Sequence, residues 1–572
     1  MFSVLVLFAL LGFTSAQRPW VMTWSPESYG PDGPWNAVLV KMGSGRQEIA
    51  MYAGRWWETY VFLSDYCSNT TTSSVCYAEE AGLFDPHMSS TWDNTSIKLD
   101  PTGYSWEDLN FSPTNAVPVS GKARRARETM ELYGTTVPDV DLISISQGYQ
   151  TYPGGQSYPL QVGYLSLGAQ DVNQTFDKIG ATMITSWLWN GSATISSYTY
   201  GMHIGSAPLG IAGSLMLGGY DKSRALGKVS AQPHTGSSAP ISLLDISLGV
   251  AEGGSPWKYP SKAGLLAQGN SSLESGVSVR ANVVDPYIYL PQSSCDAIAA
   301  ELPVTHNADL GLYFWNTDDP QYTKIVTSPS YLAFTFVKDN TNTQNITIKV
   351  PFALLNLTLE APLVEKPTPY FPCFGTEGTY ALGRAFFQAA FIGVNYGAGI
   401  VGIGNWFLAQ APGPGYSQTS TIPIEESATE LSGSGDSWEE TWASHWSPLT
   451  ESNSTSGGGS STKTTKTTEP SPQSTSSDSG GLSTGATAGI GAGCGAAGLV
   501  VIALVVWWLI RRRRQKKMAV PDVSVQQNYM PPTTYSQYSN QSERVDWGKQ
   551  TSVLELDNSR PNPGPYEMGS GR

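Results

Sequence analysis

An uncharged run that ends at a basic cluster constrains this chain of 572 residues more than any other feature. Residues 489–510 carry no charged side chain, and Arg and Lys occupy six of the next seven positions, 511–517. At about 1.5 Å per residue, a helix over the run spans about 33 Å, slightly more than the roughly 30 Å hydrocarbon core of a bilayer. We therefore expect one transmembrane helix over residues 487–510. Because basic residues beside a span stay cytoplasmic, the preceding chain faces outward and residues 511–572 form a cytoplasmic tail.

The N-terminus has the pattern of a secretory signal peptide. An apolar stretch from Val4 to Phe13 precedes three small residues at positions 14–16, as before a signal-peptidase site. The stretch is too short to cross a bilayer. We therefore predict a signal peptide over residues 1–16 and a type I single-pass protein of the plasma membrane or cell surface, with its N-terminus outside.

Composition bounds the outer region. Between the two apolar segments, about 390 residues have a globular composition, which is more than one compact core normally holds, so two lobes are expected. The formal net charge of −14 argues against nucleic acid as a partner. The histidines form no cluster with metal-ligand spacing, so we expect neither a metal nor another cofactor.

Four cysteines precede the expected span: Cys67, Cys76, Cys295 and Cys373. An even count in an oxidising compartment suggests two disulfides. The close spacing of the first two favours a local clip, which leaves the distant pair to close a long loop. Glycosylation acceptor tripeptides lie on the same side of the span. We expect modification at Asn69, Asn94, Asn173, Asn190, Asn270, Asn345, Asn356 and Asn453.

Most of the outer region has the pattern of β-strands. From Trp35 to about Gln410, apolar or alternating runs of four to eight residues are broken by Gly, Pro and Asn. Helical patterns are few, and the best are Ser294–Glu301 and Arg384–Phe391. We therefore predict an all-β fold. The clearest expected strands are Ala37–Met42, Glu48–Tyr52, Thr59–Leu63, Asp141–Ser146, Gly213–Leu217, Asn282–Leu290, Leu332–Val337 and Ile346–Pro351.

A polar stretch connects this region to the span. Residues 411–486 are rich in Ser, Thr, Gly, Pro and acidic side chains and poor in aliphatic ones, so they cannot bury enough surface to offset chain entropy. We expect a disordered stalk, O-glycosylated where Ser and Thr concentrate. Trp438, Trp442 and Trp446 recur every four residues. They indicate either a short docking helix or, as we favour, isolated aromatic residues in a linker.

Small residues recur every four positions in and before the span, at Gly485, Gly489 and Gly493. This spacing lets helices approach closely, which suggests a dimer through this face. The polar, Pro-rich tail should be disordered, and its cytoplasmic partner is unknown. In the outer region, the basic run at residues 121–127 suggests a solvated loop, and a dibasic processing site is the alternative.

Several stretches, taken in order, resemble the pepsin-like aspartic proteases over residues 35–410. This resemblance implies a two-lobed fold, with an N-terminal lobe over about 35–235, a C-terminal lobe over about 236–410, and an ectodomain over 17–410. It also suggests a membrane-anchored protein of a fungal cell surface. The matching segments are Trp35–Ser64, the loop Cys67–Cys76, Leu83–Trp92, Gly213–Asp221, Val283–Pro291, the pair Cys295 and Cys373, and Tyr380–Phe386.

The chain departs from the family where catalysis occurs. Family members cleave peptides with two aspartates, each in an Asp-Thr-Gly loop, that share one proton and activate a water. By spacing, the first aspartate position falls on Gly54. Asp285 corresponds to the second aspartate, but Pro286 and Tyr287 follow it in place of Thr and Gly. The resemblance therefore implies a member that lacks half of the catalytic pair.

We favour a catalytically inactive homologue that binds a peptide or glycan in the cleft between lobes. Asp285 would be a catalytic remnant, or simply a structural carboxylate. Trp56, Trp57 and Tyr287 would line the cleft, where flat rings cover large areas. One alternative is an active aspartic endopeptidase in which Glu58 or Asp65 replaces the missing acid. Another is a wall-stress sensor whose stalk and tail carry the function.

Overall fold

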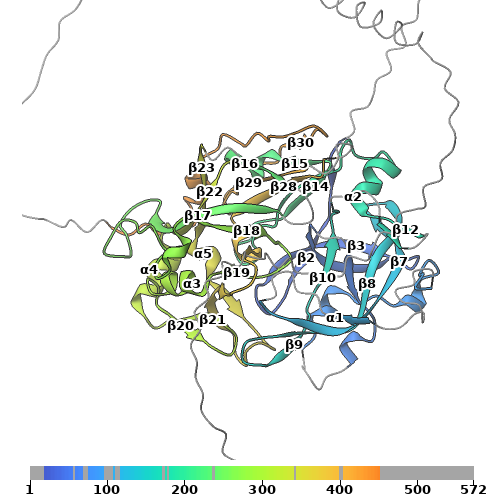
Figure 1. Cartoon of the computed structure of the whole chain (residues 1–572), viewed down its shortest axis with the longest axis horizontal. Coiled ribbons are helices and arrows are strands. Elements are labelled where there is room, and N and C mark those ends of the chain that lie inside the picture. Colours follow the sequence, from blue (N-terminus) through green and yellow to red (C-terminus); the bar gives the residue numbers. More distant parts are fainter. Residues whose placement is uncertain are drawn as a thin grey trace, which may run out of the picture. The chain divides into compact units, whose positions relative to one another are not determined.

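Figure 1 shows a computed structural model of the chain, which describes residues 18–55, 58–68, 75–95, 107–109, 116–169, 174–176, 179–234, 239–339, 343–397 and 404–450. The chain divides into two units, residues 1–457 and 458–572, and the described residues belong to the first. This unit is mostly β, as predicted. Among the described residues, no helix is long and apolar enough to cross a bilayer.

A nine-stranded sheet is built from the first part of the unit, in the order β2-β3-β4-β10-β5-β8-β7-β6, with β9 beside β8. β3 also pairs with β7. Its strands are β2 (Trp24–Tyr29), β3 (Trp35–Met42), β4 (Gln47–Gly54), β5 (Thr59–Phe62), β6 (Glu107–Leu109), β7 (Val119–Leu132), β8 (Thr135–Thr151), β9 (Ser157–Pro159) and β10 (Gly163–Ser166).

The later part of the unit builds a seven-stranded sheet in the order β23-β22-β17-β18-β27-β19-β26 and a four-stranded sheet in the order β20-β21-β25-β24. The first contains β17 (Pro240–Val250), β18 (Val277–Ala281), β19 (Ile288–Leu290), β22 (Ser330–Val337), β23 (Asn345–Pro351), β26 (Cys373–Gly375) and β27 (Ala381–Leu382). The second contains β20 (Val304–Asn307), β21 (Leu312–Trp315), β24 (Leu357–Leu359) and β25 (Thr368–Phe371).

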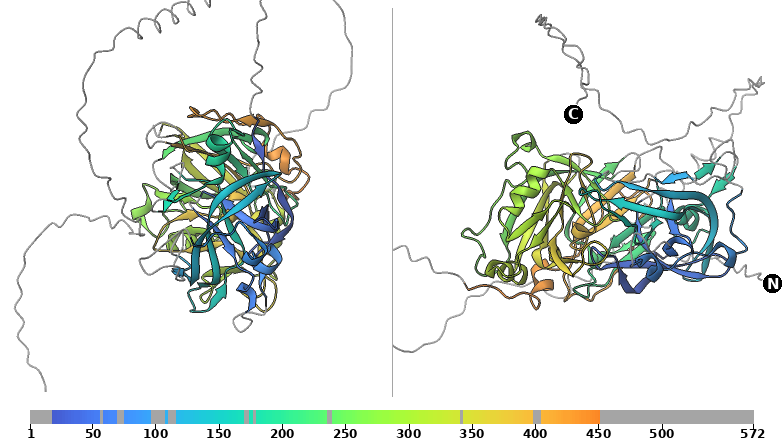
Figure 2. Two further views of the ribbon diagram at one scale, coloured as in Figure 1. Left: turned by 90° about the vertical axis from the view of Figure 1, so that its right-hand side faces the viewer. Right: turned by 90° about the horizontal axis from the view of Figure 1, so that it is seen from below.

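A six-stranded sheet, β1-β14-β13-β28-β29-β16, takes strands from both parts of the chain. Figure 2 shows the blue-to-cyan strands and the green-to-yellow strands as two groups side by side. The six strands are β1 (Trp20–Val21), β13 (Thr199–His203), β14 (Ser214–Leu217), β16 (Leu226–His234), β28 (Ala390–Asn395) and β29 (Gly404–Gln410). Two further pairs are β11 (Gln174–Phe176) with β12 (Ile179–Ala181), and β15 (Gly219–Asp221) with β30 (Thr421–Pro423).

The helices that the structure describes are short, and all but the last lie between strands. They are α1 (Tyr77–Ala81), α2 (Ile184–Ser186), α3 (Gln292–Ala299), α4 (Pro320–Thr327), α5 (Phe352–Leu355), α6 (Arg384–Phe387) and α7 (Trp438–Trp442). Local chemistry explains where they begin. At α4, for example, the Asp319 carboxylate accepts a hydrogen bond from the Gln321 amide, and Pro320 occupies the first helical position, where no amide hydrogen is needed.

The two predicted disulfides are confirmed. Cys67 bonds to Cys76, and Cys295 bonds to Cys373. The second bond connects α3 to β26, the strand beside β19. It therefore fixes one side of the segment that contains Asp285.

Residues 411–450 do not begin a disordered stalk, so this part of the stalk prediction is wrong. β30 pairs with β15, and α7 is the short docking helix that we did not favour. Trp442 is 1% exposed, and its ring centroid lies 5.4 Å from that of Trp446. Large indole rings bury enough surface to hold a segment that has few aliphatic residues.

The basic run is also not a solvated loop. Residues 121–127 lie within β7 and pair along β8. The Arg125 guanidinium donates to Glu58 and to Asp141, at 2.6 Å in each case. These acidic partners come from distant positions, which is why the sequence pattern did not reveal them. A processing protease would meet a paired strand here.

Several predictions fall outside the described residues: the signal peptide, residues 451–486 of the stalk, the span, the tail, the glycine face, Trp56 and Trp57. Glycosylation stays a prediction. Of the expected acceptors, Asn190 and Asn345 are exposed, and Asn94, Asn270 and Asn356 are partly buried. Asn69, Asn173 and Asn453 lie outside the described residues.

Candidate functional site

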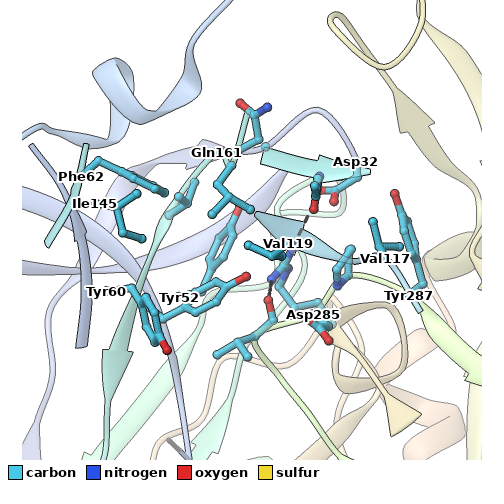
Figure 3. Close-up of a pocket in the computed structure, with 18 of the residues that line it drawn as sticks. Asp32, Tyr52, Tyr60, Phe62, Val117, Val119, Ile145, Gln161, Asp285 and Tyr287 are labelled. Carbon is cyan, nitrogen blue, oxygen red and sulfur yellow. Dashed lines mark hydrogen bonds and ion pairs between the residues drawn. The ribbon is translucent and has the colours of Figure 1, made fainter. Parts of the chain in front are cut away.

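A cavity of about 60 Å³ lies where the nine-stranded sheet meets the segment between β18 and β19. This volume holds roughly four to six water molecules, at about 10–15 Å³ for each. Its wall includes Tyr52 of β4, Tyr164 of β10, Asp285 and Arg384. Figure 3 shows Asp32 and Asp285 on two separate segments of the chain, and a dashed line marks the ion pair between Asp32 and Arg384.

Gly54, at the first-aspartate position of the resemblance, ends β4 and is buried. A Cβ atom added there would lie 2.7 Å from Cγ1 of Val284, the residue before Asp285. The two segments that the resemblance pairs are therefore in contact. The residues that meet are Gly54 and the Val284 side chain, and neither carries a carboxyl group.

This close approach leads to a prediction about stability. Changing Gly54→Ala should destabilise the protein by about 1–3 kcal/mol, because the new methyl group overlaps Val284 in a packed core. Thermal unfolding of the full chain measures the loss. Adding Val284→Ala should recover part of it, and Gly435→Ala, where a Cβ atom meets nothing within 4 Å, should change little. Equal losses in the single and double variants would contradict this contact.

The segment around Asp285 was expected to be one strand, Asn282–Leu290, and this prediction is wrong except for its last three residues. β18 ends at Ala281 and β19 starts at Ile288. The start of α6 holds the intervening loop, because the Arg384 amide donates to the Asp285 carbonyl at 2.7 Å and the Gly383 amide donates to the Tyr287 carbonyl at 2.9 Å. A side chain at Gly383 would meet both carbonyl oxygens within 2.4 Å, so the clamp requires glycine.

The Asp285 side chain lies on the cavity wall and is 7% exposed. Its carboxylate accepts a hydrogen bond of 2.8 Å from the Asn282 side-chain amide. The prediction that Asp285 lies in a cleft agrees with this position. Tyr287 is fully buried beside the cavity, where its hydroxyl lies 2.8 Å from that of Tyr152.

Arg384 connects the Asp285 loop to Asp32. Its guanidinium donates to the Val284 carbonyl, and Nη2 lies 3.8 Å from Asp32 Oδ1. The guanidinium carbon also lies 3.9 Å from the Tyr52 ring centroid, a favourable cation–π distance. Asp32 Oδ1 in turn accepts a hydrogen bond of 2.7 Å from the Trp35 indole. Neither Asp32 nor Arg384 was predicted from the sequence to be a site residue.

Burial and nearby charges have opposite effects on the pKa values of Arg384 and Asp32. Burial lowers the pKa of Arg384, but the electrostatic effects of Tyr52, Asp32 and other groups outweigh it, and the pKa is raised overall. Burial raises the pKa of the Asp32 carboxyl, and Arg384 and the Trp35 indole oppose that rise. An arginine does not lose its proton at ordinary pH. The wall of the cavity therefore carries a permanent cation.

The acids proposed as replacements lie elsewhere. Glu58 pairs with Arg125, and Asp65 is exposed. Among the described residues that line the cavity, neither is present, whereas Asp32 is. The sequence around Asp32, Pro-Asp-Gly-Pro, indicates a turn and gives no sign of a site. Within the described ranges, no three His, Cys, Asp or Glu side chains are grouped to hold a metal.

Comparison with protein-family models and with curated proteins finds no match to this chain.

Proposed function

We propose that residues 18–450 form a pepsin-like domain that binds a peptide or glycan and does not hydrolyse it. The strand order supports the fold, because two large sheets from successive parts of the chain are joined by a six-stranded sheet with strands from both. The contact of Gly54 with the Asp285 loop supports the pairing of the two catalytic segments. The domain would be displayed outside the cell on a single span, in line with its two disulfides.

The observation that carries this proposal is the position of Arg384. Hydrolysis by this family needs one carboxyl in its acid form and one ionised, with a water between them. Arg384 contacts the Val284 carbonyl and pairs with Asp32. A fixed cation favours the ionised form of nearby carboxylates. It therefore disfavours the protonated carboxyl that hydrolysis needs as a proton donor. In zymogens of this family, a basic propeptide residue neutralises the pair until activation, and Arg384 would act as an equivalent that is never removed.

A second candidate, an endopeptidase, has one observation in its favour. Asp32 lines the same cavity as Asp285, and burial raises the pKa of its carboxyl. Asp32 and Asp285 would then be the two acids in place of the usual pair. This candidate requires Arg384 to leave Asp32, since the ion pair otherwise occupies that carboxylate.

One experiment separates the two candidates. The purified full chain is incubated with a diverse peptide mixture from acid to neutral pH, and products are read by mass spectrometry. We expect the same peptide pattern from the wild type and from Asp285→Asn, which has the same shape but cannot act as an acid or base. Cleavage by the wild type that disappears in Asp285→Asn would reject the proposal in favour of the endopeptidase.

A further inference from the structure

The cavity beside Asp285 is too small for the ligands of the proposed function. Its volume is about 60 Å³, whereas pockets that bind small organic molecules measure about 300–1,000 Å³. One part of its wall is the loop that carries Asp285 and Tyr287, and another part comes from residues 150 and 160–162. A peptide or glycan can therefore reach Asp285 only when these two parts of the wall move apart.

The second part of the wall flanks the turn between β8 and β9, residues 152–156. This turn is held against the later part of the chain by two hydrogen bonds. The Gly154 amide donates to the Asp309 carbonyl at 2.8 Å, in the turn between β20 and β21. The hydroxyl groups of Tyr152 and Tyr287 are hydrogen-bonded at 2.8 Å. The second bond connects the turn directly to the loop that carries Asp285.

Gly154 lets this turn approach the four-stranded sheet closely. A Cβ atom added there would lie 2.8 Å from Cα of Asp309, closer than real Cβ atoms come to other atoms. The φ of Gly154 lies outside the left-handed region, so it is the contact with Asp309 that requires glycine. Gly154 and Asp309 are both exposed, so water can replace their hydrogen bond when the turn moves away.

A second turn makes a more buried contact with the same sheet. Residues 30–34 connect β2 to β3, and the Tyr370 hydroxyl of β25 donates to the Asp32 carbonyl at 2.7 Å. The Glu360 amide, after β24, donates to the Pro31 carbonyl at 2.8 Å. Tyr370 and Asp32 are buried. Because breaking a buried hydrogen bond leaves its groups unpaired, this contact should hold while the exposed one opens.

We propose that residues 152–156 form a latch that keeps the cavity closed, and that a ligand enters when the latch leaves Asp309. This latch regulates access to the proposed binding site and so rests on the proposed function. Each of its two hydrogen bonds changes an equilibrium by roughly two- to tenfold. Together they keep the closed state dominant and leave the open state accessible.

Carboxyl labelling of the full chain tests the latch without a ligand. The probes are a water-soluble carbodiimide and glycine ethyl ester, and mass spectrometry gives the labelling rate of each carboxyl group. Gly154→Ala, whose methyl group overlaps Asp309, should label Asp285 roughly tenfold faster than the wild type. Asp141, which is buried elsewhere in the nine-stranded sheet, should stay unlabelled. The matched control is Gly435→Ala, where a Cβ atom meets nothing within 4 Å, and it should leave the Asp285 rate unchanged.

An unchanged Asp285 rate in Gly154→Ala would overturn the latch. If Asp141 is labelled as well, the variant has unfolded, and Tyr152→Phe replaces it because it removes only the hydroxyl that bonds to Tyr287. An Asp285 rate equal to that of the wild type in this second variant would equally reject the latch.

The binding function is tested separately in the opened variant. The diverse peptide mixture, and linear oligomers of glucose and N-acetylglucosamine, are added to Gly154→Ala during labelling. Slower labelling of Asp285 in their presence supports the latch and the binding function together. If labelling is fast and none of these probes slows it, the latch stands and the binding function fails.

Discussion

Replacing Arg384 by methionine should lower the free energy of unfolding by about 3–5 kcal/mol, the usual loss when one partner of a buried ion pair is removed. Arg384 is 4% exposed and Asp32 is 6% exposed. Without the guanidinium, the Asp32 carboxylate keeps its bond to the Trp35 indole but has lost its counter-charge. The Val284 carbonyl also loses a donor. Thermal unfolding of the purified full chain, followed by tryptophan fluorescence, gives the change.

Two further variants decide whether the lost charge is the cause. Arg280→Met is the matched control, because Arg280 is exposed on β18 in the same sheet as the Asp285 loop, and it should change stability by less than about 0.5 kcal/mol. Combining Arg384→Met with Asp32→Asn removes both charges, so the loss should be smaller than the sum of the two single losses. Additive losses would show that the two side chains do not act as a pair.

The strands near the site could be predicted because their signal is local. β3 and β22 were expected within two residues of their bounds, since apolar runs between turn residues depend on nearby positions. The loop between β18 and β19 was missed for the opposite reason. It is held by hydrogen bonds from Gly383 and Arg384, which lie far along the sequence and leave no mark on its own pattern.

In the site, too, some residues could be predicted from the sequence and others could not. Asp285 was placed in a cleft through a resemblance that rests on residue order, and it lines the cavity. Arg384 lies inside a segment that matches the resemblance, yet its ion pair with Asp32 joins residues far apart in the sequence and leaves no sequence signal. For α7 a signal existed. Ser437 and Glu440 have the spacing of a helix cap, and the Ser437 hydroxyl accepts a hydrogen bond from the Glu440 amide.

A second large effect is expected at Arg125, where Arg125→Met should cost about 3–5 kcal/mol at neutral pH. Its side chain is 12% exposed and the carboxylate of Asp141 is 2% exposed. The variant would leave Asp141 and Glu58 close together without the cation that both contact at 2.6 Å. A surface pair is the control. Arg46 meets Glu131 at the same distance but is 61% exposed, so Arg46→Met should cost less than about 1 kcal/mol.

The pH dependence of the loss at Arg125 separates charge from packing. Burial is the main cause that raises the pKa of Asp141 to about 7, against the lowering effect of Arg125. Because the folded pKa lies above the unfolded value, the contribution of this group to stability is present in acid and is lost as the pH rises toward 7. Removing Arg125 raises that pKa further, so the difference between variant and wild type should be nearly constant in acid and should grow as the pH rises above about 7. If the difference is constant over this range, the lost guanidinium acts through its packing alone, and Asp141 is not the group that Arg125 stabilises.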